Sequence, residues 1–587
     1  MAVALFVFIM FQQRFLRKPG SGPNRILPKL KAATVTSVQI RPADQLEIRA
    51  DRTNGTWQLT EPLVYPAQGL SIEKLLAELE GLIPASHIKA RELQDRPRTD
   101  EEYGFASPQA SISIEQPRYT ARLRVGAKTT PGDQVFLQVV GVEGVYVVNA
   151  DLLNYLPRTA DDWRDTTLIN LNGLAFDRLA VTNGTKMFEL RRDAANKPWR
   201  MVYPLQARAN TTKTEESLQM LQSVRVGRFV TPDPKADAEA FGLQPPELEV
   251  ALGQGTNTVA RLQFGKSPTN DARLVYARRL GMNGIVAVPK DLLTPWYAQV
   301  NDFRDPFLLT GTGSVAAIDV RGPDSFSLQQ QTNDMWRIVP QDLPADAGLV
   351  KDLLTALSGL QIAEFTKDVA IAADLPERGL ASPAQQYVLR GATTNTPAGP
   401  TNPIIVEVDF GTNQGDKVFA RRADEGCIYA VKFADFQRLP GASWEMRERR
   451  IWDFSTNDVA RLTVQQQDRV RQMVRNGPQD WSLAPGSQGV INVLAVEEAV
   501  RGLCQLTAVA WLARGDQSRT RYGFTDKDQR VTLELKNGDK ATVEFSALAS
   551  PNSPYAAVTM DGQLWLFQFP TWLNDYVQRY LSVPLKP

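Results

Sequence analysis

The sequence predicts an α+β protein made of four tandem repeats, each a mainly antiparallel sheet with one long amphipathic helix on its face. Within each repeat, stretches of alternating hydrophobicity surround one stretch whose apolar residues are three and four apart. A tryptophan opens each repeat at intervals of roughly 140 residues, far longer than the period of a solenoid. Each repeat is therefore long enough to form a small domain with its own core. These tryptophans are Trp57, Trp199, Trp336 and Trp481.

Each repeat carries its landmarks in the same order. A proline follows the tryptophan after four or five residues, and the amphipathic helix comes next. A glycine step follows the helix, and a basic-acidic pair ends the repeat, although the fourth repeat lacks this pair. The glycines are Gly104, Gly242, Gly379 and Gly523, and the pairs are Arg164-Asp165, Arg304-Asp305 and Arg447-Glu448.

Length and composition agree with four domains. A chain of 587 residues allows three to five domains at roughly 100 to 200 residues each. The content of 43% hydrophobic and 22% charged residues is that of an ordinary globular protein. Lys and Arg number 66 against 65 Asp and Glu, so no nucleic-acid partner is expected. The two cysteines, Cys427 and Cys504, fall in different repeats and imply no disulfide framework.

The landmarks also set the expected boundaries. Residues 1–18 are an apolar anchor, and 19–34 form a stalk whose prolines and glycines prevent regular structure. A Pro- and Thr-rich insertion, 393–403, is expected to be a disordered surface loop within the third repeat. The repeats span 35–171, 172–313, 314–455 and, in the most divergent copy, 456–587.

The N-terminal run of apolar residues, Met1 to Phe11, is followed by Arg14, Arg17 and Lys18. It is shorter than the about 20 apolar residues of a membrane-spanning helix, and it lacks the basic leader and cleavage site of a signal peptide. One interpretation places the start inside a longer span. Another is a short anchor whose basic flank favours a cytoplasmic body. A third is packing on the first domain.

The first repeat illustrates the expected elements. Strands are predicted around residues 35–40, 46–48 and 57–59, with a hairpin at Asn54-Gly55. Apolar residues from Ile72 to Leu82 then share one helix face, with Ser71 as the helix cap. Four strands and a short helix at 151–156 follow. The corresponding helices are expected at 214–224, 347–360 and 493–506, and left-handed glycines are expected in late hairpin turns at Gly144, Gly284, Gly426 and Gly562.

No catalytic, cofactor or metal site is predicted. His87 is the single histidine, which excludes a multi-histidine metal site, and no serine or acidic pattern accompanies it. The Gly253-Gln254-Gly255 and Gly311-Thr312-Gly313 strings lack the sequence context of a phosphate loop and are interpreted as turns or linkers.

The basic-acidic pairs are the most prominent polar feature. Each precedes apolar residues that begin the next repeat, so we expect a bidentate arginine-carboxylate bond that clamps one domain to the next. A binding role is the alternative. The four tryptophans are expected to be core anchors because they lie on strands before a proline, although exposed aromatic residues also bind glycans or peptides.

Together these landmarks, behind an apolar N-terminal segment, resemble the bacterial domain-of-unknown-function 4340 family. The resemblance implies a membrane-anchored envelope protein associated with ABC-transporter components of the gliding-motility type, with an extracytoplasmic body. It carries no catalytic residues. We therefore expect a non-enzymatic protein of the cytoplasmic membrane that acts as a scaffold or accessory subunit of a transporter assembly. The alternative is an extracytoplasmic binding protein for a glycan, lipid or peptide, and a hydrolase comes third.

Overall fold

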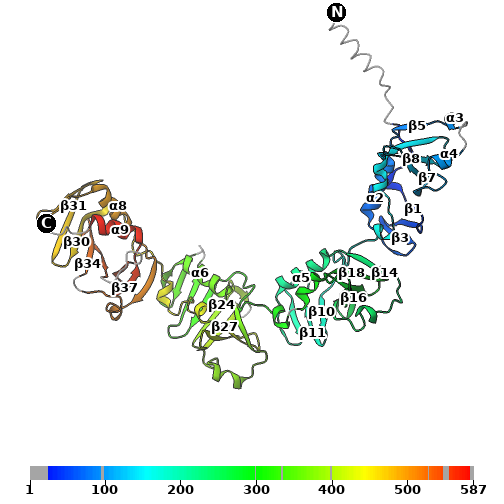
Figure 1. Ribbon diagram of the computed structural model, residues 1–587. Coiled ribbons are helices and arrows are strands. Elements are labelled where there is room, and N and C mark those ends of the chain that lie inside the picture. The colour runs from blue at the N-terminus through cyan, green and yellow to red at the C-terminus, as the bar shows by residue number, and fades with distance from the viewer. Residues whose placement is uncertain are drawn as a thin grey trace, which may run out of the picture. The chain divides into compact units, whose positions relative to one another are not determined.

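The computed structural model describes residues 24–93, 98–297, 299–331, 335–396, 399–525, 528–546 and 554–581. Within these ranges the α+β prediction is confirmed. Four large antiparallel sheets match the four repeats, and each takes one stretch of the colour gradient in Figure 1. The predicted anchor, 1–18, lies outside the described residues.

The first two sheets have nine strands each in the same order, β4-β3-β2-β1-β6-β7-β8-β9-β5 and its counterpart β13-β12-β11-β10-β15-β16-β17-β18-β14. The strands of the first are β1 (Ser37–Pro42), β2 (Ile48–Thr53), β3 (Thr56–Glu61), β4 (Tyr65–Pro66), β5 (Ser86–Ile88), β6 (Ala110–Gln116), β7 (Tyr119–Lys128), β8 (Gln134–Val139) and β9 (Val145–Asn149). Those of the second are β10 (Arg178–Asn183), β11 (Lys186–Arg191), β12 (Arg200–Tyr203), β13 (Ala207–Arg208), β14 (Arg228–Thr231), β15 (Leu248–Gln254), β16 (Asn257–Phe264), β17 (Leu274–Arg279) and β18 (Ile285–Pro289).

The third sheet keeps the nine-stranded order, whereas the fourth has eight strands. The third contains β19 (Ala317–Arg321), β20 (Phe326–Gln330), β21 (Trp336–Val339), β22 (Leu343–Ala345), β23 (Ile362–Lys367), β24 (Gln385–Arg390), β27 (Ile404–Gln414), β28 (Lys417–Arg422) and β29 (Ile428–Lys432). The fourth contains β30 (Val459–Gln466), β31 (Arg469–Gly477), β32 (Asp480–Leu483), β33 (Ala510–Arg514), β34 (Gln529–Leu535), β35 (Lys540–Phe545), β36 (Tyr555–Met560) and β37 (Gln563–Gln568).

One helix in each repeat joins the two edges of its sheet, because the strands before and after it lie at opposite ends of the strand order. These helices are α2 (Gly69–Gly81), α5 (Thr211–Ser223), α6 (Ala347–Ser358) and α8 (Val493–Cys504). The predicted cap of α2 is wrong. The helix begins before Ser71, whose amide donates to the carbonyl of Gln68 at 3.0 Å inside the first turn. Asparagine or aspartate side chains cap the other three.

Each helix buries one face against its own sheet. α2 contributes Ile72, Leu75, Leu76 and Leu79 to the core of the first repeat. The second, third and fourth repeats have separate cores of their own. A helix of this length has little stability alone, so burial of its apolar face holds it in place.

Most of the predicted turns have the expected geometry. Asn54 and Gly55 both have positive φ and close the hairpin between β2 and β3. Gly144, Gly284 and Gly562 are left-handed. The prediction for Gly426 is wrong, because its φ lies outside the positive region that favours glycine. The predicted short helix at 151–156 is a 3-10 helix, η2 (Ala150–Tyr155).

The prediction for the insertion in the third repeat is also wrong. Instead of a disordered loop, it contains the paired strands β25 (Thr394–Thr396) and β26 (Gly399–Thr401). The neighbouring strands β24 and β27 are paired up to the insertion. Their hairpin brings the ends of the insertion together, which favours pairing within it.

The glycine step is a place of close backbone approach. Gly242 has a φ of +70°, and a Cβ atom on it would lie 2.9 Å from the amide nitrogen of Lys266. A Cβ atom on Gly265, the last landmark of the RLQFG strand, would lie 2.2 Å from the carbonyl oxygen of Phe241. Gly104 with Gly126 and Gly379 with Gly411 repeat this contact. Two glycines therefore let the loop after the helix lie directly on a central strand.

The fourth repeat makes the same close contact with a different residue. Gly523 keeps a left-handed φ of 72°, but Ser546 stands where the other repeats have the second glycine. Its Oγ donates to the carbonyl oxygen of Tyr522 at 2.5 Å. A hydrogen bond from a small side chain thus replaces the glycine contact at the same carbonyl.

We predict that Gly265→Ala destabilises the second repeat by about 1–3 kcal/mol, because the added methyl group overlaps the carbonyl oxygen of Phe241. The measurement is hydrogen exchange of the β16 amides in the full-length protein, which reports local opening. Gly81→Ala is the control, since a Cβ atom there meets nothing within 4 Å. Unchanged protection of β16 in Gly265→Ala would show that the contact is not a packing constraint.

Candidate functional site

The four motif tryptophans are buried in the cores of their repeats. In three repeats the indole Nε1 donates a hydrogen bond to a glutamate sixteen residues further along the chain, on the helix that crosses the sheet. A buried indole N–H requires such an acceptor. The pairs are Trp57 with Glu73 at 2.7 Å, Trp199 with Glu215 at 2.7 Å and Trp481 with Glu497 at 2.8 Å.

An arginine completes each of these three contacts. It pairs with the glutamate, and its guanidinium carbon lies within 5 Å of the centre of the tryptophan ring, at cation-π distance. The arginines are Arg52, Arg192 and Arg475. We call the tryptophan, glutamate and arginine of one repeat its indole link. The indole link joins two strands of the sheet, or the residues next to their ends, to the helix.

The third repeat has different residues at these positions. Gln330 lies opposite Trp336 in the strand register, as Arg52 lies opposite Trp57. Asp352, sixteen residues after Trp336, is exposed and one methylene shorter than glutamate. The arginine and glutamate of the indole link were not predicted from the sequence. The constant spacing of sixteen residues between tryptophan and glutamate is the signal that could have found the glutamate. The arginine precedes the tryptophan by five, seven or six residues, so no fixed spacing identifies it.

The basic member of the first basic-acidic pair lies between two repeats. Arg164 is buried, and its guanidinium carbon lies 4.2 Å from the ring centre of Tyr65 in the first repeat. It also lies 3.7 Å from the ring centre of Phe229 in the second repeat. Its Nη1 donates to Asp161, in its own repeat, at 3.1 Å. The contact with the next repeat is therefore a stack on an aromatic ring, not the expected arginine-carboxylate bond.

The chain passes from the first core to the second within a few residues. Trp163 belongs to the first core and Leu168 to the second. Between them the carbonyl of Thr166 accepts a hydrogen bond from the amide of Val226 at 2.7 Å. The junction thus combines a buried arginine, a backbone hydrogen bond and a short connection.

The acidic members share another role. Asp165, Asp305 and Glu448 each accept a hydrogen bond from the amide two residues later. This is the local bond by which acidic side chains stabilise a turn. Their donors are the amides of Thr167, Phe307 and Arg450, at 2.9, 3.0 and 3.2 Å. The basic and acidic members of a pair therefore have separate tasks.

The junction between the third and fourth repeats does contain an arginine-carboxylate contact. Arg447 Nη2 donates to Asp561 of the fourth repeat at 2.7 Å, and its guanidinium carbon lies 4.5 Å from the ring centre of Trp565. The indole Nε1 of Trp511 donates to the Arg447 carbonyl at 3.1 Å. Here one hydrogen bond to a carboxylate adds to the aromatic stack, in place of a bidentate pair.

Arg304 and Asp305 stand at the end of one compact unit and the start of the next. Arg304 is buried, and its Nη1 donates to Asn301 at 3.3 Å. Asp305 accepts from the hydroxyl of Thr310 at 2.6 Å. The position of Arg304 after a 3-10 helix, and the turn at Asp305, repeat those of Arg164 and Asp165.

The remaining sequence candidates lie outside any catalytic arrangement. His87 is exposed on the edge strand β5 and stacks on Tyr146, with ring centres 4.3 Å apart. Among the described residues, no group of three or more His, Cys, Asp or Glu side chains is placed to hold a metal ion. No helix in the described ranges is both long and apolar enough to cross a membrane.

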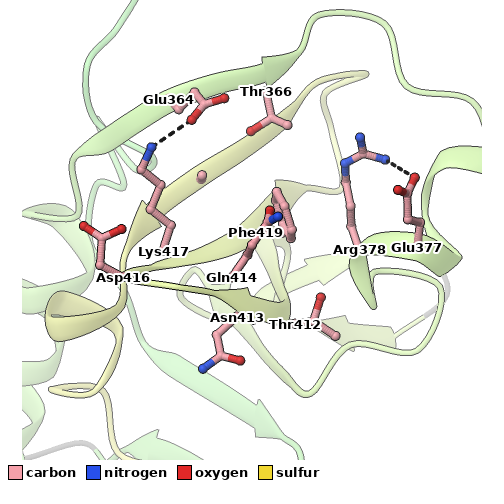
Figure 2. A pocket seen from close by; sticks show the side chains of 11 residues that line it. Glu364, Thr366, Glu377, Arg378, Thr412, Asn413, Gln414, Asp416, Lys417 and Phe419 are labelled. Carbon is pink, nitrogen blue, oxygen red and sulfur yellow. Dashed lines mark hydrogen bonds and ion pairs between the residues drawn. The ribbon is translucent and has the colours of Figure 1, made fainter.

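A polar cavity of about 620 Å³ opens in the third repeat, beside β23, β27 and β28. Figure 2 shows Phe419 between two ion pairs. On one side Lys417 Nζ lies 2.9 Å from Glu364, and the hydrogen bond to this carboxylate raises the pKa of Lys417. On the other side Arg378 Nη1 lies 3.3 Å from Glu377. No sequence pattern predicted this cavity.

The sequence matches the family described as Domain of unknown function (DUF4340) over residues 57–240, 199–366 and 336–490. Each matched segment begins at a motif tryptophan and runs into the following repeat. The comparison with curated proteins gives no match.

We predict that Glu497→Ala opens the fourth repeat, because it leaves Arg475 buried without its carboxylate. Loss of one partner of a buried pair costs about 3–5 kcal/mol. The readout is alkylation of Cys504, a thiol whose pKa burial raises to about 12, so that it reacts only when the repeat opens. Glu498→Ala is the matched control because this neighbour is half-exposed. Equal alkylation rates in the two variants would contradict a stabilising indole link.

We also predict that Arg164→Ala loosens the junction between the first two repeats, since it removes the side chain stacked between Tyr65 and Phe229. Hydrogen exchange at the Val226 amide should accelerate about tenfold or more, as expected for the loss of a desolvated cation-π contact and its packing. Arg158→Ala, at an exposed position just before the junction, should leave this exchange unchanged. The same acceleration in both variants would argue against the stack.

Proposed function

The chain belongs to the DUF4340 family, and from this premise we propose that it is a non-enzymatic scaffold of the bacterial envelope. An N-terminal anchor tethers it to the cytoplasmic membrane, and its body lies outside the cytoplasm. It is an accessory subunit of an ABC-transporter-type assembly, of the kind associated with gliding motility.

One observation carries this proposal: the recurring residues are used to build and couple domains. The indole links join helix to sheet inside repeats, and Arg164 and Arg447 contact the following repeat. A scaffold needs coupled domains because it must hold its contact surfaces at defined positions. The near-neutral charge of +1 leaves shape and apolar contacts to select a protein partner.

The C-terminal helix α9 (Thr571–Tyr580) is the surface that we propose for this partner. This helix follows β37, the last strand of the fourth sheet. Trp572, Tyr576 and Tyr580 form a row of ring contacts along it. Trp572 remains 57% exposed. Aromatic side chains of this kind are enriched at protein interfaces.

A second function, binding of a glycan, lipid or peptide by an extracytoplasmic body, is favoured by the polar cavity of the third repeat. It does not require a transporter partner. It is also compatible with the scaffold role, because the cavity and α9 belong to different repeats.

The test of the scaffold proposal is affinity purification of the detergent-solubilised full-length protein from its own membranes. We expect an ABC-type permease or ATPase to be recovered, and Trp572→Glu to reduce its recovery at least about tenfold, as for an interface hot spot. Tyr203→Glu, at a residue 51% exposed in the second repeat, should have no effect. If no transporter component is recovered, the scaffold proposal is contradicted. If recovery with Trp572→Glu equals that of the unchanged protein, α9 is not the contact surface.

A further inference from the structure

Three of the four repeats have a small apolar cluster beside the glycine step. The residue before the glycine is aromatic, and its ring packs against an aromatic residue on a neighbouring strand. The ring pairs, with the distance between ring centres, are Tyr103 and Phe136 at 4.7 Å, Phe241 and Tyr276 at 4.9 Å, and Tyr522 and Tyr555 at 5.5 Å.

The third repeat keeps only one ring of this pair. Phe419 stands at the position of Tyr276, in the matching strand sequences KVFARR and LVYARR. Before the glycine, however, lies Arg378, with its guanidinium carbon 5.7 Å from the Phe419 ring centre. A charged side chain thus replaces the second ring.

A second position of the cluster has changed in the same way. On the edge strand, Ile88, Val230 and Leu512 pack against the apolar clusters of the first, second and fourth repeats. The strand register places Thr366 at the corresponding position of β23. Two of the apolar positions around Phe419 are therefore polar in the third repeat.

This change accompanies the polar cavity of about 620 Å³, with Phe419 half-buried in its lining. In the first repeat the cavity beside the cluster is smaller, about 340 Å³, and Tyr103 and Phe105 contribute to its wall. The third repeat has thus exchanged a packed apolar cluster for an accessible aromatic face within a polar wall.

The rim of the cavity carries neutral polar groups that are free to bind. Thr412, Asn413 and Gln414 are exposed, and their side chains make no hydrogen bond to any residue that the structure describes. They supply hydroxyl and amide groups that both donate and accept. The charged groups do not form a cationic site, because Lys417 pairs with Glu364, Arg378 pairs with Glu377, and Asp416 adds a negative charge.

We propose that this cavity binds a neutral saccharide. The apolar face of a sugar ring would pack on Phe419, and its hydroxyl groups, which donate and accept, would bond to Asn413 and Gln414. The wall has three acidic and two basic side chains, and this excess of negative charge disfavours a phosphate or another anion. The wall also contains too little apolar surface to bury a lipid chain. This site does not depend on the scaffold role, but it rests on the second proposed function, whose ligand class it specifies.

The experiment is saturation-transfer difference NMR on the purified full-length protein, with chitotriose, maltotriose and cellotriose as probes at roughly 10 mM, a concentration suited to millimolar affinity. At least one trisaccharide should bind. Phe419→Ala should weaken it about tenfold, and Phe419→Tyr, the residue of the second repeat, should retain it.

The Asn413→Ala and Gln414→Ala variants should each weaken binding about fivefold, through the loss of one hydrogen bond. Both residues are exposed, so these variants should fold. Gln329→Ala, an exposed amide elsewhere in the repeat, should have no effect. The proposal is overturned if no trisaccharide binds, if binding is insensitive to Phe419 and the two amides, or if the dipeptide glycylglycine binds in place of the sugars. Saccharide binding to this cavity requires no transporter, so a negative result here leaves the partner experiment unaffected.

Discussion

The attachment of the helix to the sheet through a buried tryptophan is the contact on which the first, second and fourth repeats depend. The helix connects the two edge strands of the sheet, so its position determines where both edge strands lie. Apolar burial supplies attraction without direction. The indole link adds direction, because Trp481, Glu497 and Arg475 must meet at hydrogen-bond distance. Burial of its charged groups is tolerated only because each has its partner.

The junctions between repeats also depend on a few side chains, each with its own role. Arg164 ends one repeat and places its guanidinium on Phe229 of the next, while Asp165 forms the turn that directs the chain into the second core. Arg447 and Glu448 divide the tasks in the same way, with Asp561 added as a carboxylate partner. Coupling and chain direction are thus provided by adjacent residues. This supports a function in which the relative placement of domains matters.

The third repeat departs from the others in two places. It has Gln330 and Asp352 at positions of the indole link, and Arg378 and Thr366 at positions of the apolar cluster. Its core remains large, since the buried residues of sheet and helix are still present. A tandem protein tolerates such divergence in one copy because each domain has its own core. That freedom is the physical basis of the saccharide site that we propose for the third repeat.

By itself, the sequence determined the repeats, their helices and most of their turns. Hydrophobic spacing from Ile72 to Leu79 and the left-handed conformation of Gly144 are local properties that each segment expresses alone. Only the tertiary structure decided what the polar residues contact. The Arg164-Asp165 sequence suggests an arginine-carboxylate bond. In the structure, the contact between the first and second repeats instead places the arginine on the ring of Phe229, 65 residues further along the chain. The cavity at Phe419 likewise forms where four strands and a 3-10 helix meet, because a binding surface is made from residues that local pattern does not bring together.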